Sequence, residues 1–318
     1  MASNVELSEL SSAHLHEAVP YAVITPPGYN ESGPFPLCVV LMGGGGSRQS
    51  LIDCRPLFES WWSESVLAPM VLATPSAGMS YYLEDPEHGV RWESFILEEF
   101  IPHLRATCKV GADRRSTAIM GISMGGYGAL KLAFAHPEQV AAVAAMNPML
   151  EPGYSDAQIG ARNRLHHTSG GPARLIGPGR DPELFAANNP ANRARANAER
   201  IRESALPIYI EVGDNDFVNA HDGTEFLHRV LWDLDLSHEY RLVRGGDHGG
   251  PTFRPRMRAT YAWLSAVLTA PTAAEPTAEE LALNAMRAQL QPLREQAVAS
   301  DPTVHRRFGI LPTATVPE

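Results

Sequence analysis

Residues 116–136 carry the pattern that most restricts the possible folds of this chain. A short apolar run at 116–120 leads directly into Gly-Ile-Ser-Met-Gly at 121–125, and small residues dominate from Gly126 to His136, before Pro137. A buried strand joined to a helix by so tight a turn is typical of a parallel sheet whose faces are covered by helices. This unit therefore predicts an α/β architecture.

The same alternation runs through most of the chain. Apolar runs of strand length alternate with stretches that have apolar residues at helical spacing, which indicates a doubly wound, mostly parallel sheet with helices on both faces. The expected strands are 21–24, 36–42, 70–73, 116–120, 140–145, 207–212 and 239–243, and the expected helices are 92–104, 126–136, 224–236 and 253–268. We therefore predict one large α/β domain over residues 1–270, followed by an appendage.

Residues 148–206 interrupt this pattern. They are rich in Gly, Pro, Asn and Arg, and they separate the expected strands 140–145 and 207–212. A structureless loop of this length is uncommon in a compact domain. We predict a cap or lid inserted over the functional site, with a plain surface excursion as the alternative.

The composition changes again after Ala270. Thr277 and Glu280 form a capping-box pattern, and an apolar stripe follows at Leu283, Met286, Leu290, Leu293 and Ala297. Pro292 is expected to kink this helix or to divide it. We predict that residues 271–318 form a C-terminal helical extension that docks on a neighbouring subunit, giving a homo-oligomer, or back on its own domain.

Charge and composition exclude several classes of function. With 26 Lys and Arg against 36 Asp and Glu, the net charge is -10, so the chain lacks the basic surface that a general nucleic-acid-binding protein needs. The N-terminus has no signal-peptide pattern and no run of 18 apolar residues occurs, which predicts a cytoplasmic protein with no membrane partner. Cys38, Cys54 and Cys108 cannot all pair, as expected of reduced thiols.

The pentapeptide at 121–125 fits the pattern G-x-S-x-G, in which a serine sits on a sharp turn between a strand and a helix. Side chains two residues before or after that serine would clash across the turn, which explains Gly121 and Gly125. A glycine-rich turn without a nucleophile is the alternative. The strand before the turn and the helix after it favour Ser123 as a nucleophile.

A serine hydroxyl is a poor nucleophile at neutral pH and needs a base, which in turn needs a carboxylate to orient it. His248 lies in Gly-Gly-Asp-His-Gly-Gly, directly after an expected strand. Asp216 and Asp214 both follow the preceding expected strand; Asp216 is favoured as the acid and Asp214 is the alternative. Because the carboxyl ends of parallel strands share one edge of the sheet, we predict a catalytic triad of Ser123, Asp216 and His248.

Acyl transfer also needs amide donors for the negative oxygen that develops on the carbonyl. One candidate is the amide of Met124, the residue after the serine. The other comes from the four glycines at 43–46, where Gly44 is favoured and Gly45 is the alternative. No Lys-Ser/Thr pair follows these glycines, which argues against a phosphate-binding loop.

No set of His, Cys, Asp and Glu has metal-ligand spacing, so we predict neither a metal nor another cofactor.

Aromatic residues close to these loops are candidates for a substrate pocket. Tyr82 and Trp92 lie in a polar and aromatic stretch after the expected strand 70–73, and Phe217 directly follows the favoured acid. With Gly45 they form the predicted substrate-binding set. Core packing is the alternative for the aromatic side chains.

The stretch from Gly121 to Leu130, preceded by Trp92-Glu93 and a helix, resembles the esterase D group of α/β-hydrolases. That group includes S-formylglutathione hydrolases, the feruloyl and acetylxylan esterases of carbohydrate esterase family 1, and mycolyltransferases. The resemblance extends from about Tyr21 to Leu268 and implies the α/β-hydrolase fold. In this group the acid follows a glycine by three residues, which maps onto Asp216, and the first oxyanion donor maps onto Gly44.

The resemblance and the residues together imply a serine esterase that hydrolyses a small-molecule carboxylic ester through an acyl-enzyme intermediate. Two related reactions use the same groups and stay open. They are transfer of the acyl group to an acceptor other than water, and thioester hydrolysis of the S-formylglutathione hydrolase type. A non-catalytic binding protein on a hydrolase scaffold is the alternative from a different class.

Overall fold

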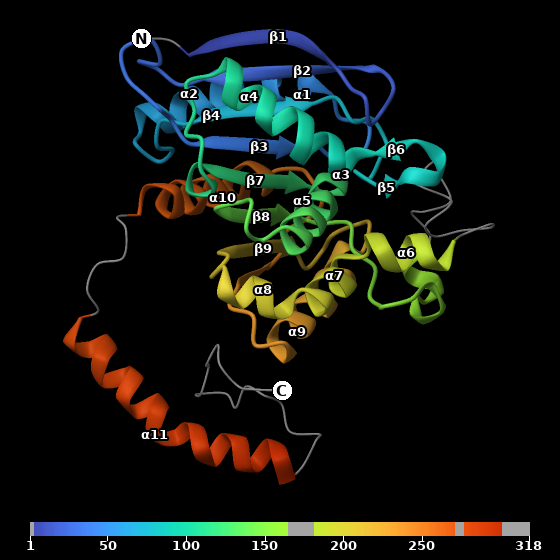
Figure 1. The fold of residues 1–318 in the computed structure, drawn as a ribbon, viewed down its shortest axis with the longest axis vertical. Coiled ribbons are helices and arrows are strands. Elements are labelled where there is room, and N and C mark those ends of the chain that lie inside the picture. Colours follow the sequence, from blue (N-terminus) through green and yellow to red (C-terminus); the bar gives the residue numbers. More distant parts are fainter. Residues whose placement is uncertain (1–2, 165–180, 271–276, 301–318) are drawn as a thin grey trace.

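Eight strands form one sheet in the order β1-β2-β4-β3-β7-β8-β9-β10 (Figure 1). The computed structural model describes residues 3–164, 181–270 and 277–300. The strands are β1 (Asn4–Ser11), β2 (Ala18–Thr25), β3 (Leu37–Leu41), β4 (Val71–Pro75), β7 (Thr117–Ile122), β8 (Ala142–Met146), β9 (Ile208–Gly213) and β10 (Glu239–Val243). β2 is antiparallel to both β1 and β4, and all other neighbours in the sheet are parallel. The predicted mostly parallel sheet is confirmed.

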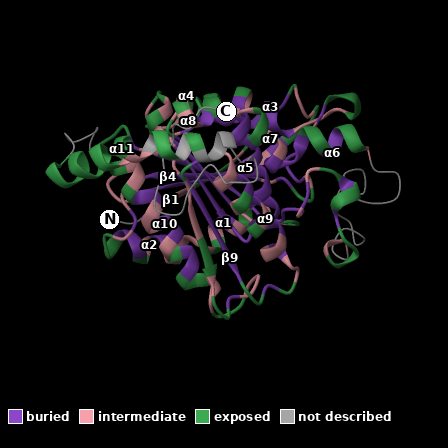
Figure 2. Cartoon of the chain, turned by 90° about the horizontal axis from the view of Figure 1, so that it is seen from below, coloured by how far each residue is buried: buried purple, intermediate pink, exposed green. Residues whose placement is uncertain are grey.

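The central strands are apolar because helices cover both of their faces. Every residue of β3, β4, β8 and β9 is buried, as expected for strands that meet no solvent on either side. On one face lie α1 (Arg48–Asp53), α2 (Arg55–Ser63) and α10 (Phe253–Thr269), whose Phe58 and Tyr261 rings pack edge to face. In Figure 2 the buried strands run between the helical layers.

The opposite face is covered by a second set of helices. These are α3 (Trp92–Ser94), α4 (Ile101–Thr107), α5 (Met124–Ala135), α7 (Pro190–Ala196), α8 (Ala198–Glu203) and α9 (Ala220–Asp233). A π-helical turn at Phe95–Phe100 joins α3 to α4. It ends two residues before Pro102, which has no N–H to offer the carbonyl of the preceding turn.

Most strands and helices lie where the sequence predicts them, and the differences have local causes. β1 was not expected because its residues alternate without an apolar run; it is an exposed edge strand that pairs with β2 from Asn4↔Thr25 to Ser11↔Ala18. The short helices α1 and α2 were not expected either, because each spans too few residues to show a helical period. A small hairpin, β5 (Glu84–Asp85) with β6 (Val90–Arg91), also escaped prediction.

The insertion between β8 and β9 contains α6 (Pro182–Asn188), α7 and α8, together with short 3₁₀ turns before residue 164. α7 packs against α5 and α9, so this part of the insertion belongs to the helical layer beside the sheet. Residues 165–180 of the predicted cap lie outside the described residues. The cap over the site therefore stays a prediction.

The C-terminal helix α11 (Ala278–Ser300) is a single element that contains Pro292, so the proline does not divide it. Figure 1 shows its axis bending along its length, beside the main body. Leu283, Met286 and Leu293 of the predicted stripe are exposed, so these side chains are not buried on the chain's own domain. Docking on a second copy of the chain stays a prediction.

No helix within residues 3–164, 181–270 and 277–300 is long and apolar enough to cross a membrane.

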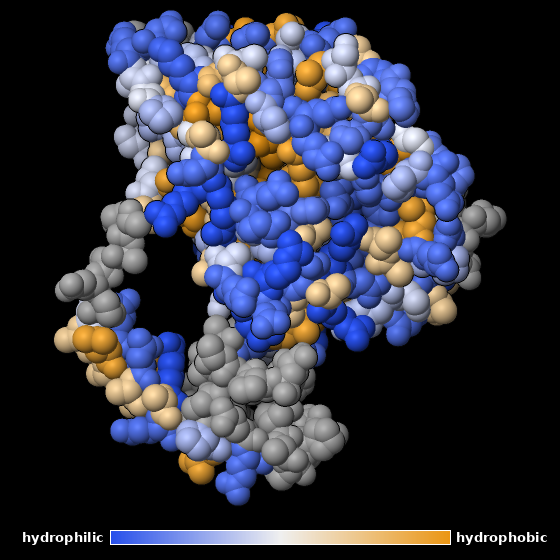
Figure 3. Space-filling model, in the orientation of Figure 1, coloured by the Kyte–Doolittle hydropathy of each residue, from blue (hydrophilic) through white to orange (hydrophobic). Residues whose placement is uncertain are grey.

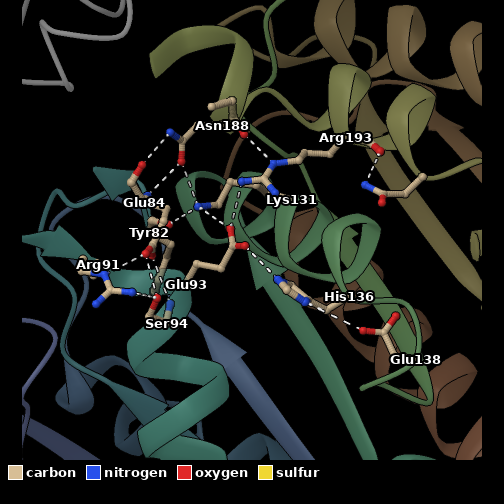
Figure 4. Close-up of polar contacts among 12 residues, drawn as sticks. Tyr82, Glu84, Arg91, Glu93, Ser94, Lys131, His136, Glu138, Asn188 and Arg193 are labelled. Atoms are coloured by element: carbon tan, nitrogen blue, oxygen red, sulfur yellow. Dashed lines mark hydrogen bonds and ion pairs between the residues drawn. The ribbon is translucent and has the colours of Figure 1, made fainter. Parts of the chain in front are cut away.

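A buried polar network connects α3, α5 and the inserted helices (Figure 4). The Lys131 ammonium lies 3.3 Å from the Glu93 carboxylate and donates to Asn188 Oδ1 at 3.0 Å. His136 Nε2 lies 2.9 Å from Glu93 Oε1. Arg193 lies 3.5 Å from Glu93 Oε2, the oxygen that Lys131 also contacts. The network thus links the α5 layer to both α6 and α7 of the insertion.

The charges in this network depend on each other. Burial alone would raise the pKa of Glu93, but the hydrogen bond with His136 and the charges of Lys131 and Arg193 lower it to about 2. Burial lowers the pKa of Lys131 to about 8, against the attraction of Glu93. Both groups are therefore charged at pH 7.

Lys131→Met is expected to reduce the free energy of unfolding at pH 7 by about 3–5 kcal/mol, because the buried Glu93 carboxylate loses its main counter-charge. Urea unfolding followed by circular dichroism measures the change. The double variant Glu93→Gln/Lys131→Met is the control and should recover most of the loss, since it removes both charges together. A single variant as stable as the parent would contradict the assignment.

Candidate active site

Ser123 lies on a strained turn between β7 and α5. Its φ of 56° and ψ of -120° place it in a region that residues with side chains rarely adopt. A Cβ on Gly121 would overlap the carbonyl of Gly125, and a Cβ on Gly125 would overlap the carbonyl of Leu41 in the neighbouring strand β3. Only glycine fits at these two positions, as the sequence predicts, and the turn presents the Ser123 hydroxyl beyond the carboxyl end of the sheet.

Two loops from neighbouring strands bring His248 and Asp216 to this serine. His248 Nε2 lies 2.9 Å from Ser123 Oγ, and His248 Nδ1 lies 2.8 Å from Asp216 Oδ2. The Asp216 side chain is fully buried, whereas the His248 side chain is 18% exposed. Asp216 Oδ2 accepts a hydrogen bond from the Nδ1–H of His248, which leaves Nε2 to accept a hydrogen bond from the Ser123 hydroxyl.

The structure places Asp216, and not Asp214, against the histidine. Asp216 Oδ1 accepts hydrogen bonds from the amides of Val218 at 3.0 Å and Ala220 at 3.4 Å, which fix the carboxylate beside α9. Asp214 Oδ1 instead accepts from the amide of Gly245 at 2.6 Å. Asp214 therefore ties the loop of the acid to the loop of the histidine.

Asp247 makes a second connection between these loops. Its Oδ1 accepts hydrogen bonds from the amide of Phe217 at 3.0 Å and from the amide of His248 at 2.7 Å. These two bonds lower the pKa of Asp247, so the carboxylate that holds the loops stays ionised. Asp214 and Asp247 do not touch the imidazole, but they position the loops that carry Asp216 and His248.

Three buried residues behind the loops were not expected from the sequence. Asn147, at the end of β8, donates to the carbonyl of His248 at 3.2 Å and accepts from the amide of Gly213 at 3.4 Å. Arg256 of α10 lies 3.3 Å from Glu211 of β9. Burial raises the pKa of Glu211 to about 7, against the lowering effect of Arg256. A polar residue directly after the apolar run of β8 was the one signal that could have identified Asn147.

The Arg256 side chain packs where the two loops cross. A Cβ on Gly213 would overlap the carbonyl of Gly246, and a Cβ on Gly246 would lie 2.7 Å from the Arg256 guanidinium. Glycine at both positions therefore lets the loop that follows β9 and the loop that follows β10 approach each other above the guanidinium.

The glycine loop after β3 lies beside the serine. A Cβ on Gly43 would lie 3.3 Å from the Cβ of Ser123. The amide of Gly45 donates to the carbonyl of Gly78 at 2.9 Å, so that amide is already used. No described group accepts a hydrogen bond from the amide of Gly44, and the amide of Met124 begins α5, where helical amides have no partner within the helix. The amides of Gly44 and Met124 are thus available as donors.

The predicted substrate-binding residues separate into two groups. Phe217 is 68% exposed, and its ring centroid lies 5.6 Å from that of His248. Tyr82 and Trp92 are buried in the hydrophobic core, where their rings pack edge to face at 5.8 Å. For these two residues the structure shows core packing, the alternative that the sequence left open.

A family model named Esterase matches residues 12–264. The chain belongs to the Esterase family. The match contains the strands from β2 to β10, the glycine loop and the loops that carry Ser123, Asp216 and His248. Membership confirms the resemblance to α/β-hydrolase esterases that the sequence predicts.

Curated relatives of this family member include mycobacterial proteins. Esterase Rv1288 of Mycobacterium tuberculosis is 30% identical over 117 residues, which are 35% of this chain and 25% of that protein. The chain thus spans about a quarter of that relative's length. Diacylglycerol acyltransferase/mycolyltransferase Ag85B of Mycobacterium intracellulare is 27% identical over 221 residues, 65% of this chain and 63% of that protein.

Solved structures of esterases share the fold. A ferulic acid esterase superposes with a TM-score of 0.68 at 19% identity, covering 84% of this chain and all of the other. An S-formylglutathione hydrolase from Agrobacterium tumefaciens gives a TM-score of 0.65 at 16% identity, covering 84% of this chain and 96% of the other. The predicted α/β-hydrolase fold is confirmed.

Exchanging each candidate acid for its amide distinguishes Asp216 from Asp214. Asp216→Asn is expected to lower kcat for p-nitrophenyl acetate by about 10⁴-fold, because the amide no longer stabilises the His248 tautomer that carries its proton on Nδ1. Asp214→Asn is the matched control; it keeps the oxygen that accepts from Gly245 and should cost less than about 10-fold. Equal losses in the two variants would remove the distinction.

Proposed function

We propose that this protein hydrolyses small-molecule carboxylic esters through an acyl-enzyme intermediate on Ser123. The observation that carries the proposal is the continuous contact from Ser123 Oγ to His248 Nε2 at 2.9 Å and from His248 Nδ1 to Asp216 Oδ2 at 2.8 Å. These distances allow a proton to leave the hydroxyl and let the carboxylate stabilise the imidazolium that results. Membership of the Esterase family supports the same reaction class.

In the first step His248 takes the hydroxyl proton while Ser123 Oγ attacks the ester carbonyl carbon. The negative charge that develops on the carbonyl oxygen is stabilised by the amides of Gly44 and Met124. The imidazolium then gives its proton to the leaving alcohol as the C–O bond breaks, and the acyl group stays on Ser123. In the second step water replaces the alcohol, and the same transfers release the acid and restore the serine.

The exposed Phe217 ring beside His248 has the position of a substrate contact. The amide of Phe217 donates to Asp247, which holds the backbone of Phe217 beside the loop that carries His248. An apolar ring next to the base suits an ester with an apolar acyl or alcohol group. A small ester that lies between Phe217 and the glycine loop is therefore the proposed substrate class.

Ser123→Ala is expected to lower kcat for p-nitrophenyl acetate by about 10⁶-fold and to abolish labelling by a fluorophosphonate probe, because both need the hydroxyl as nucleophile. Ser63→Ala, which changes an exposed serine at the end of α2, is the control and should match the parent in both assays. Parental turnover by the Ser123→Ala variant would remove Ser123 from the mechanism. Absence of probe labelling in the folded parent would favour a binding protein.

Acyl transfer is a second candidate, favoured by the likeness to Ag85B, which is named as an acyltransferase and matches 65% of this chain. The first step is the same; an alcohol then takes the place of water. We expect free acid to be the main product when p-nitrophenyl butyrate is turned over in the presence of glycerol, as measured by mass spectrometry. A glyceryl ester as the main product would favour transfer.

A further inference from the structure

Two consecutive aromatic residues, Tyr81 and Tyr82, have left-handed backbone conformations. Their φ angles are 51° and 52°. This region is uncommon for any residue with a side chain and more so for two bulky residues in succession. Strain of this kind persists only where the surroundings fix it, and it is concentrated near functional sites. The contacts of this turn therefore indicate its role.

The turn is held from several directions. The Lys131 ammonium donates to the carbonyl of Tyr82 at 2.6 Å (Figure 4). The hydroxyl of Ser80 accepts from the amide of Tyr82 at 3.0 Å. The Tyr82 ring packs directly on Gly128 of α5, where an added Cβ would lie 2.6 Å from the ring. The Trp92 ring packs edge to face with the Tyr82 ring, with the two ring centroids 5.8 Å apart. The buried charge network thus fixes the turn.

The same turn contacts both segments that supply the proposed oxyanion donors. The Tyr82 hydroxyl donates to the carbonyl of Met42 at 3.1 Å, and Met42 directly precedes the glycine loop that contains Gly44. The amide of Tyr81 donates to the sulfur of Met124 at 3.2 Å. Burial raises the pKa of Tyr82, so its hydroxyl keeps the proton that it donates.

The loop before the turn adds contacts with the glycines themselves. Gly78 accepts a hydrogen bond from the amide of Gly45 at 2.9 Å, and the sulfur of Met79 lies 2.9 Å from where a Cβ of Gly44 would be. Four consecutive glycines have no side chains of their own to restrict their conformation. The segment Gly78–Tyr82 therefore supplies the restraint that the glycine loop lacks.

We propose that Tyr82 is a positioning residue for the oxyanion hole: its hydroxyl fixes Met42, and thereby the amide of Gly44, relative to the amide of Met124. The inference rests on the proposed function, because it assigns a role to those two amides. The sequence made Tyr82 a candidate for substrate contact; here it acts through the backbone of the glycine loop. Donors of an oxyanion hole stabilise the transition state only when their positions are fixed in advance.

Tyr82→Phe tests the proposal, because it removes the hydroxyl and keeps the ring on Gly128. Tyr127→Phe is the matched control: Tyr127 is also fully buried, and its hydroxyl donates one hydrogen bond, to the carbonyl of Asn188 at 2.8 Å. The measurements are kcat and KM for p-nitrophenyl acetate, the affinity for a trifluoromethyl ketone that forms a tetrahedral adduct, and melting temperature.

For Tyr82→Phe we expect kcat to fall about 10-fold to 100-fold, less than the ~10²–10³-fold that follows outright loss of a donor. KM should stay within about 2-fold, and affinity for the ketone should fall by the same factor as kcat, because both report transition-state binding. Tyr127→Phe should keep kcat within about 2-fold while its melting temperature falls as much as that of Tyr82→Phe.

Unchanged kcat in Tyr82→Phe, or an equal loss in both variants, would overturn the positioning role. A fall in melting temperature with parental kcat and ketone affinity would show that the hydroxyl serves stability alone. These outcomes are separate from failure of the proposed function, which Ser123→Ala tests: an inactive Ser123→Ala variant beside a fully active Tyr82→Phe variant would overturn this inference only.

Discussion

The arrangement of the site depends on a steric constraint at the turn after β7. Ser123 holds a left-handed conformation because Gly121 and Gly125 let the chain reverse where any Cβ would meet a backbone carbonyl. The second of those carbonyls belongs to Leu41 of β3, so the turn packs directly against the neighbouring strand. The strained serine is therefore a product of sheet packing, and its conformation is fixed before any substrate binds.

The loops opposite the serine are held by polar contacts to the backbone. Asp214 and Asp247 each connect the segment after β9 to the segment after β10, and Asn147 connects Gly213, at the end of β9, to His248. Below them Arg256 and Glu211 form a buried ion pair. The Arg256 guanidinium lies against Gly213 and Gly246, so the two loops pack on this pair.

On the other side of the serine the restraint comes from the core. The Glu93–Lys131 pair is buried among helices, yet Lys131 also holds the carbonyl of Tyr82. The same ammonium group therefore joins the stability of the helical layer to the strained turn beside the glycine loop. Asn188 of the inserted helix α6 accepts a hydrogen bond from the same ammonium group. The insertion therefore helps to position the turn beside the glycine loop.

Local patterns in the sequence were enough to predict the strands β2 to β10 of the sheet, the turn at Ser123 and the choice of His248, because each depends on neighbouring residues: apolar runs, glycines at fixed spacing, and a histidine between glycines after a strand. Sequence patterns favoured Asp216 over Asp214 and Gly44 over Gly45, but only the fold shows that Asp216 faces the imidazole, that the Gly45 amide is already bonded, and that Tyr82 packs inside the core. Asp214 and Asp216 are two residues apart and chemically identical, so their different contacts come from the path of the loop. That path depends on hydrogen bonds with Gly245 and Asp247, far away in the sequence, and such distances are set by tertiary packing.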